Sequence, residues 1–220
     1  MDATFDHYIN YTNVPSTSPT ADPCDPSSLN DPGGQGHVPI WNALLNNDDF
    51  FDDYLNRWQD LANGPLSCDY MVNLLDSMIA VIDPEMPGQI AKWGGNYATW
   101  QSNVQDMRNF ILARCDSMNA GFVPCYPALS GPFNVTVEII GIGEVEMSDN
   151  NIINEINTPW TDQRFGGVNL PFEVKSGTFV NWEVIPAGVY AFDPLVDTLE
   201  LELQGDVTVI ANFIPPTPTR

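Results

Sequence analysis

Hydrophobic and polar positions follow a helical period through the first half of the chain. In the segments 50–61, 71–82 and 100–111, apolar side chains recur at three- and four-residue steps, which places them on one face of a helix. In the last two segments, the residues predicted to face inward are Met71, Leu74, Leu75, Met78, Ile79, Ile82, Trp100, Val104, Met107, Phe110 and Ile111. These segments predict three amphipathic helices that pack through their apolar faces.

Residues that begin and end helices stand between these segments. Gly64-Pro65 ends the first helix. Ser67 and Asn96 suit the N-caps of later helices, because their side chains can accept hydrogen bonds from unpaired backbone N–H groups. The prolines within 83–87 break or restart the second helix. With a further short helical segment after Pro39, the first half is predicted to be a bundle of about four helices.

After residue 126 the pattern changes from helical spacing to alternation. Apolar residues at 133, 135, 137 and 139 are separated by mostly polar ones, which is typical of a half-buried β-strand. The predicted strands are Phe133–Ile139, Glu144–Met147, Ile152–Ile156, Val168–Val174, Thr178–Val184, Thr198–Leu203 and Val207–Phe213. Short strands separated by Gly, Pro and Asn turns predict a small all-β unit, sandwich-like or an open barrel.

These patterns assign the chain to the α+β class, with a helical bundle followed by a sandwich-like β module. We expect a helical domain over residues 1–126, beginning with an irregular segment at 1–37, and an all-β domain over 127–214. The Pro- and Thr-rich tail, 215–220, is expected to be an extended linker.

The charge of the chain excludes several kinds of partner. It carries 29 acidic residues against 7 Lys and Arg, for a net charge of −22. A uniformly negative field repels phosphate backbones and anionic membrane surfaces, so we expect no nucleic-acid partner. No stretch approaches the ~18 apolar residues that span a bilayer, so no membrane span is predicted. The acidity is explained by a solvated surface in a salty or extracellular setting.

The four cysteines, Cys24, Cys68, Cys115 and Cys125, form an even set that allows three disulfide pairings. None of them forms Cys-x-x-Cys, and the two histidines are far from most of them, so a zinc site is not expected. The preferred pairing is Cys115–Cys125 with Cys24–Cys68. Oxidised cysteines imply a periplasmic or extracellular location.

The first residues of the chain lack the basic and apolar regions of a secretion signal, although the rest of the chain looks exported. We therefore expect the chain to be the C-terminal part of a longer protein that is extracellular or on the cell surface. The chemistry of that protein would then lie upstream.

Candidate site residues are weighed against simpler structural roles. The densest acidic cluster is Asp48, Asp49, Asp52 and Asp53. It lacks the EF-hand order of calcium ligands, and favourable charge at a helix start explains it. His37 has no Ser or Cys nucleophile motif beside it, so a hydrogen-bonded turn residue is preferred over a general base. Asp83 and Glu85 lie in a proline-broken turn with no evident pocket, which does not favour an acid–base pair.

Aromatic residues are candidates for ligand stacking as well as for the core. In the helical half, the core interpretation is preferred for Trp58, Trp93 and Trp100. In the β half, core packing is preferred over an exposed patch for glycans or partners; the residues are Trp160, Phe165 and Trp182.

Several runs in the first half resemble the C-terminal part of the spore coat protein H (CotH) kinase family. The matching runs lie at 1–5, 8–12, 17–24, 31–37, 54–61, 66–69, 82–87, 92–95 and 100–115. They include Tyr54-Leu55-Asn56-Arg57-Trp58-Gln59-Asp60-Leu61 and Ile82-Asp83-Pro84-Glu85-Met86-Pro87. The resemblance covers roughly residues 1–126 and implies an atypical protein-kinase-like fold that transfers phosphate from a nucleotide to secreted proteins.

The resemblance also implies where the chemistry of such a protein would lie. The metal-binding element of the family resembles Trp-Asp-x-Asp-x-x-Phe-Gly, and Asp2 matches its second aspartate, whereas Asp6 stands where the family usually has Gly. Asp6 and His7 are near enough to join an acidic cluster with Asp2. The nucleotide-binding lobe and the catalytic loop would be upstream, so Asp2 is the candidate metal ligand and no catalytic or cofactor-binding residue is assigned. ATP, Mg²⁺ and a protein substrate are expected for the full-length protein.

The β half is similar to bacterial repeat modules of the divergent listerial B-repeat type. The matching residues include Gly143-Glu144-Val145-Glu146-Met147, Asn181-Trp182 and Val209-Ile210-Ala211-Asn212-Phe213. This resemblance implies a spacer or adhesive element without chemistry. Two functions are therefore expected for the chain: the part of an exported kinase that is inert alone, or an extracellular binding or structural module that acts through its β domain.

Overall fold

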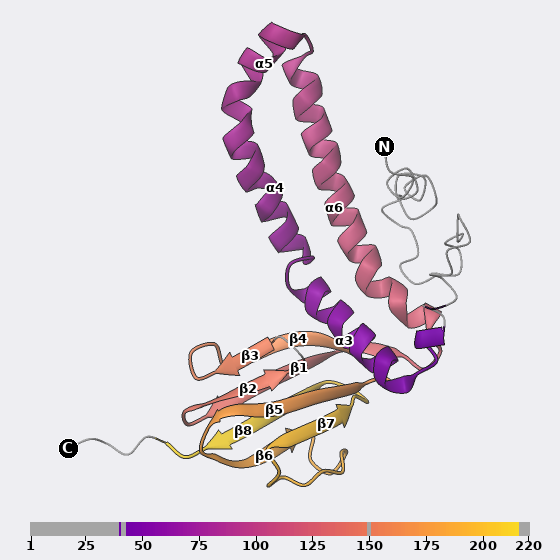
Figure 1. Cartoon of the computed structure of the whole chain (residues 1–220), viewed down its shortest axis with the longest axis vertical. Coiled ribbons are helices and arrows are strands. Elements are labelled where there is room, and N and C mark those ends of the chain that lie inside the picture. Colours follow the sequence, from indigo (N-terminus) through magenta and orange to yellow (C-terminus); the bar gives the residue numbers. More distant parts are fainter. Residues whose placement is uncertain (1–39, 41–42, 149–150, 216–220) are drawn as a thin grey trace, which may run out of the picture. The chain divides into compact units, whose positions relative to one another are not determined.

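The computed structural model describes residues 40, 43–148 and 151–215 (Figure 1). Contacts divide the chain into two compact units. One unit contains Gly64–Cys125, and the other contains Pro39–Asn63 together with Tyr126–Arg220. A helix from the first half of the chain is therefore part of the β unit, which differs from a division at residue 126.

The first unit is a helical hairpin. Its elements are α4 (Cys68–Ile82), the 3-10 turn η3 (Asp83–Glu85), α5 (Met86–Trp93) and α6 (Tyr97–Cys125). The predicted caps are confirmed: the Ser67 hydroxyl accepts a hydrogen bond from the Tyr70 backbone, and Asn96 accepts one of 2.8 Å from Ala98. Among the described residues, no single helix meets the length and apolar content needed to cross a bilayer, although Asp48–Asn63 and Cys68–Trp93 do so as one bent pair.

In the hairpin, α4 and α6 lie side by side and run in opposite directions (Figure 1). A small apolar cluster holds them together, with Leu75, Ile111 and Cys115 as its buried members. Asp76 and Arg108 add an ion pair across the two helices.

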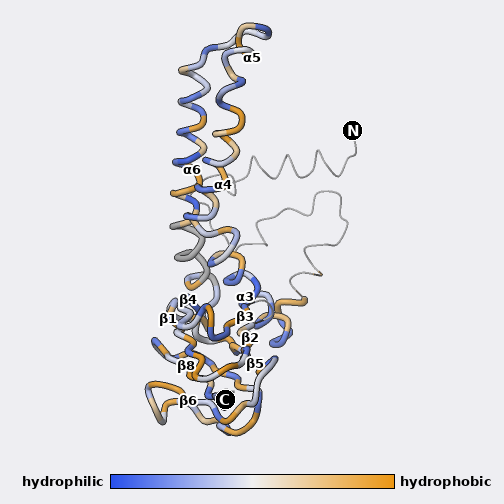
Figure 2. Tube along the Cα trace, turned by 90° about the vertical axis from the view of Figure 1, so that its left-hand side faces the viewer, coloured by the Kyte–Doolittle hydropathy of each residue, from blue (hydrophilic) through white to orange (hydrophobic). Residues whose placement is uncertain are grey.

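Much of the apolar surface of the hairpin stays exposed. Apolar (orange) and polar (blue) stretches alternate along both helices in Figure 2. The prediction of inward-facing side chains is wrong for five residues, which are at least 42% exposed: Leu74, Met78, Ile82, Met107 and Phe110. Each helix has an apolar stripe wider than its single partner among the described helices of this unit can cover.

The second unit is a β-sandwich with one helix. The helix is α3 (Asp48–Asn63). The strands are β1 (Ser130–Ile140), β2 (Gly143–Met147), β3 (Asn151–Asn154), β4 (Trp160–Gly166), β5 (Asn169–Gly177), β6 (Phe179–Ile185), β7 (Thr198–Glu202) and β8 (Val207–Phe213). One sheet has the order β4-β1-β8-β6 and the other β3-β2-β5-β7. Neighbouring strands are antiparallel except for β1 and β8, which are parallel. The α+β class and the sandwich-like β part are confirmed.

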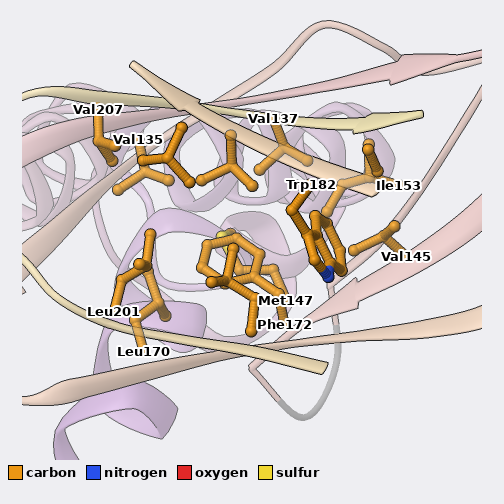
Figure 3. Packing of buried hydrophobic residues seen from close by; sticks show 14 of the residues in the cluster. Val135, Val137, Val145, Met147, Ile153, Leu170, Phe172, Trp182, Leu201 and Val207 are labelled. Carbon is orange, nitrogen blue, oxygen red and sulfur yellow. The ribbon is translucent and has the colours of Figure 1, made fainter. Parts of the chain in front are cut away.

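The core of the sandwich lies between the two sheets (Figure 3). Alternate residues along each strand point into it, such as Val135 and Val137 on β1 and Val145 and Met147 on β2, all fully buried. Trp182 on β6 is 1% exposed and packs near Phe172 and Phe179. Burial of this alternating face is the main favourable term for the unit, since apolar area removed from water contributes about 25 cal/mol per Å².

Seven of the eight described strands correspond to predicted ones, and β4 is the strand that the hydrophobic pattern missed. Its inward-facing positions include Asp162 and Arg164, both buried. A strand with charged residues on its buried face does not show the alternation of apolar and polar residues on which strand prediction depends.

Candidate functional site

Several predicted site residues lie outside the described part of the chain. These are Asp2, Asp6, His7, Cys24 and His37. The metal-ligand prediction for Asp2 therefore stays a prediction. Within residues 40, 43–148 and 151–215, no group of three or more His, Cys, Asp or Glu side chains is arranged to hold a metal ion.

The acidic cluster lies at the start of α3, as predicted. Asp48 and Asp49 occupy the first turn of the helix, and the Asn47 side chain caps it by accepting a 2.9 Å hydrogen bond from the Phe50 backbone. Negative charge is favourable there, because the N-terminal N–H groups of a helix carry partial positive charge. This placement supports the helix-start interpretation of these aspartates.

Beside this helix start is a cavity of about 430 Å³. Its lining residues come from the start of α3 and the segment just before it, from the segment before β1, and from the β4–β5 turn. They are Leu45, Asn46, Asp48, Phe51, Asp52, Ala128 and Gly167. Burial raises the pKa of Asp52 above its usual value, and the neighbouring carboxylates of Asp48, Asp49 and Asp53 raise it further, against the lowering effect of a hydrogen bond that Asp52 accepts from the Asn169 backbone. No Lys or Arg lines this cavity, so two carboxylates dominate its charge.

The residues that line this cavity do not fit a nucleotide. Phosphoryl transfer requires cationic groups or metal ions around the phosphates together with a cradle of backbone N–H donors. A cavity with two carboxylates and no basic side chain repels a triphosphate. This cavity is therefore not a site for ATP.

The most strongly organised polar site is a buried ion-pair cluster under α3. Arg164 of β4 is fully buried, and its Nη2 lies 2.6 Å from Asp60 Oδ1 of α3. The same nitrogen donates a hydrogen bond of 2.7 Å to Asp162 Oδ2. Burial raises the pKa of Asp162, against the opposing effect of the Arg164 charge. Three charged groups are thus desolvated together, which proteins tolerate only when the charges are paired.

Neutral side chains complete this cluster. The second Asp60 oxygen accepts a hydrogen bond of 3.0 Å from the Ser148 hydroxyl, and Asp60 Oδ1 accepts one of 2.6 Å from the Asn151 amide. Asp60 therefore joins α3 to the β2–β3 connection as well as to β4.

Amides along the same face of α3 extend the contact to the backbone of both sheets. The Asn56 amide donates to the Asn169 carbonyl of β5 at 2.8 Å. The Asn63 and Gln59 amides donate to the Gln163 carbonyl of β4 at 2.9 and 3.3 Å. Since β4 and β5 belong to different sheets, α3 bridges the two halves of the sandwich.

Sequence reasoning missed this cluster, although the sequence contains a signal for it. Asn56, Asp60 and Asn63 recur at three- and four-residue steps, so they form a polar stripe on one helix face. Asp162 and Arg164 are two residues apart, which puts opposite charges on one side of a strand. Only the tertiary contact reveals that the two stripes face each other.

The aromatic candidates of the β unit belong to its core. Trp182 and Phe165 are 1% and 3% exposed, and Trp160 packs against the core cluster. The preferred core interpretation is therefore confirmed, and these residues do not form an exposed patch. In the hairpin the core interpretation is wrong for Trp93, which is 70% exposed and carries the Lys92 ammonium over its ring.

The turn residue Asp83 has a structural contact. It accepts a hydrogen bond from the Tyr97 hydroxyl, which joins η3 to the start of α6 and raises the pKa of Tyr97. This contact supports the preference for a structural role over an acid–base pair with Glu85.

The predicted disulfides are not confirmed. Cys68 and Cys115 take part in no disulfide among the described residues. Cys24 and the Cys125 side chain lie outside the described residues.

Comparison with protein families decides the relationship of the chain. A family model described as CotH kinase protein matches residues 1–118. The chain belongs to the CotH kinase family. No curated protein and no solved structure matches it.

The match to the CotH kinase family covers more than half of the chain and ends within α6, before the first strand. It includes α3, the helix that carries Asp60. One helix of the CotH-matched segment is therefore built into the β unit through a buried ion pair.

Proposed function

We propose that this chain is the C-terminal part of an exported CotH-type protein kinase and that it transfers no phosphate by itself. Membership in the CotH kinase family supports the kinase assignment. The proposal places the nucleotide lobe and the catalytic loop upstream of residue 1, with ATP and Mg²⁺ bound there. Asp2 would be the single residue of the metal-binding element in this chain.

The observation that carries the proposal is the exposed apolar face of the hairpin. Tyr70, Leu74, Met78 and Val81 recur along α4 at three- and four-residue steps, and each is at least 44% exposed. A stripe of this kind is normally covered by another element. We propose that the upstream part of the kinase domain covers it.

In this proposal the β unit is a spacer or surface-binding element of the B-repeat type. Its inward-facing aromatic residues are used for packing, so a ligand would have to bind elsewhere on the unit. The Asp60–Arg164 ion pair fixes α3 of the CotH segment to the sandwich. In this proposal α3 is an integral part of the β unit.

A phosphotransfer assay tests the proposal that the chain transfers no phosphate by itself. Purified protein of residues 1–220 is incubated with γ-labelled ATP, Mg²⁺ and casein, beside an Asp2→Asn variant. We expect no incorporation into either casein or the protein. Incorporation by the unmodified chain that is lost in Asp2→Asn would overturn the proposal, because it would show a complete site that uses Asp2.

The DNA sequence upstream of codon 1 tests the proposal that the chain is the C-terminal part of a longer protein. We expect the reading frame to continue into a nucleotide-binding lobe and a signal peptide. An in-frame stop codon directly upstream would contradict it.

A further inference from the structure

We propose that Cys68 and Cys115, which are not joined in this structure, form on oxidation a disulfide bond that joins α4 to α6. Both side chains belong to the apolar cluster that holds the hairpin together, with Leu75 and Ile111. Cys115 is 5% exposed and Cys68 is half-buried. This inference does not depend on the kinase assignment.

The alignment of the two helices places the cysteines at the same level of the hairpin. Asp76 and Arg108 form a two-point ion pair, in which Arg108 Nη1 donates to Asp76 Oδ2 at 2.9 Å. Because the helices are antiparallel, residues before Asp76 on α4 lie level with residues after Arg108 on α6. Cys68 lies eight residues before Asp76 (76 − 68 = 8), and eight residues after Arg108 is position 116 (108 + 8 = 116), next to Cys115.

The two cysteines also lie on the faces that the helices turn toward each other. On α4, Cys68 comes two helical turns before Leu75, the buried residue of the cluster. On α6, Arg108, Ile111 and Cys115 follow one another at steps of three and four residues, so they share one face. Level and face together put Cys68 and Cys115 at facing positions on the two helices.

This pairing differs from the one preferred on sequence spacing, which joined Cys115 to Cys125 and Cys24 to Cys68. It leaves Cys24 and Cys125 as the second pair of the even set. A bond between α4 and α6 closes a longer loop than Cys115–Cys125, and in the chain-entropy model a longer loop restricts the unfolded chain more.

The reaction requires a disulfide oxidant of the exported compartment, such as oxidised glutathione. One thiolate attacks the oxidant and forms a mixed disulfide, and the second thiolate then displaces the bound glutathione. The protein loses two protons and two electrons, and the oxidant is reduced to two thiols. One S–S bond forms in the protein and one breaks in the oxidant.

Peptide mapping of the full chain tests the pairing directly. The protein is oxidised with glutathione, alkylated without reduction, and digested with trypsin and chymotrypsin. Cleavage after Phe122 separates Cys115 from Cys125, and cleavage after Arg57 separates Cys24 from Cys68. We expect the Cys68 peptide joined to the Cys115 peptide, with a mass lower by two hydrogen atoms than the sum of the two thiol peptides. A Cys68 peptide joined to any other cysteine, or alkylated as a thiol, overturns the proposal.

A variant series gives a second measurement. Cys68→Ser, Cys115→Ser and the double variant are melted beside the unmodified chain, each oxidised and reduced. A shared disulfide predicts that all three variants lose the same number of degrees under oxidising conditions and that reduction removes most of this difference. Additive losses, or equal losses under reduction, would contradict a bond between the two residues.

Discussion

Arg164 and Asp60 form a fully buried ion pair that links a strand of the sandwich to a helix from the first half of the chain. Their closest atoms, Nη2 and Oδ1, are 2.6 Å apart. The guanidinium is 0% exposed, and Asp162 shares the same nitrogen at 2.7 Å. An uncompensated charge at this depth is costly, so α3 and β4 depend on each other for their charge balance.

Removing one partner of this pair should therefore strongly destabilise the β unit. Asp60→Ala leaves Arg164 without one of its two carboxylates, and breaking a buried pair costs about 3–5 kcal/mol. Urea unfolding followed by far-UV circular dichroism measures the loss in free energy of unfolding.

The matched control is Lys175→Met, which removes two ion pairs at the surface of the same unit. Lys175 lies 2.6 Å from Glu146 and 2.7 Å from Glu173, but its side chain is 32% exposed. Water screens these pairs, so their loss should lower the free energy of unfolding much less than Asp60→Ala does. Equal changes for Asp60→Ala and Lys175→Met would contradict the role given to the buried pair.

Trp182 should behave as a core residue and not as a ligand contact. Trp182→Ala removes the most bulky of the fully buried side chains and its 2.9 Å hydrogen bond from Nε1 to the Val196 carbonyl. Such truncations cost about 3–5 kcal/mol, and Trp182→Phe should cost less because the ring volume is largely kept. The exposed Trp93→Ala is the control and should leave the unfolding of the β unit unchanged. A stable Trp182→Ala variant would reopen the binding interpretation.

Gly167 should not tolerate a side chain. Its φ is +83°, and a Cβ there would overlap the carbonyl oxygen of Ala128. The left-handed backbone alone costs about 1–2 kcal/mol for a non-glycine residue. We expect Gly167→Ala to lower the thermal midpoint clearly. Gly205→Ala, where nothing lies within 4 Å of the added Cβ, should leave it nearly unchanged. Equal thermal midpoints for Gly167→Ala and Gly205→Ala would contradict the requirement for glycine at position 167.

Local signals predicted the element boundaries well. Ser67 and Asn96 cap helices where the sequence placed them, because capping depends on a few neighbouring residues. Gly64-Pro65 likewise follows directly on the end of α3 at Asn63. The α+β class followed from the change of hydrophobic period after residue 126.

Relations between distant segments could not be predicted in the same way. The apolar residues Met107 and Phe110 were assigned to the inside, but an apolar stripe alone does not say how much of it a partner covers. Strand β4 and the polar face of α3 were missed for a related reason. Charged residues in a sequence are normally assigned to the surface, and the tertiary contact that pairs Asp162, Arg164 and Asp60 is not visible in the sequence.

The titration of Asp162 gives a test of the same cluster by pH. Burial raises its pKa in the folded protein above its usual value of 3.8, so the folded state keeps a proton that the unfolded chain has already released. The contribution of this group to stability is therefore fully present below the unfolded pKa and is lost as the pH rises through the folded pKa. Asp162→Asn cannot titrate and lacks this dependence.

Urea unfolding of both proteins between about pH 3 and pH 7 measures this effect, since that interval brackets the usual carboxyl range. We expect the free energy of unfolding of the unmodified chain, minus that of Asp162→Asn, to fall as the pH rises. The matched variant cancels the titration of the other acidic groups, which are common to both proteins. A difference that rises with pH would mean that the Arg164 charge outweighs burial and holds Asp162 ionised, with its pKa lowered instead of raised.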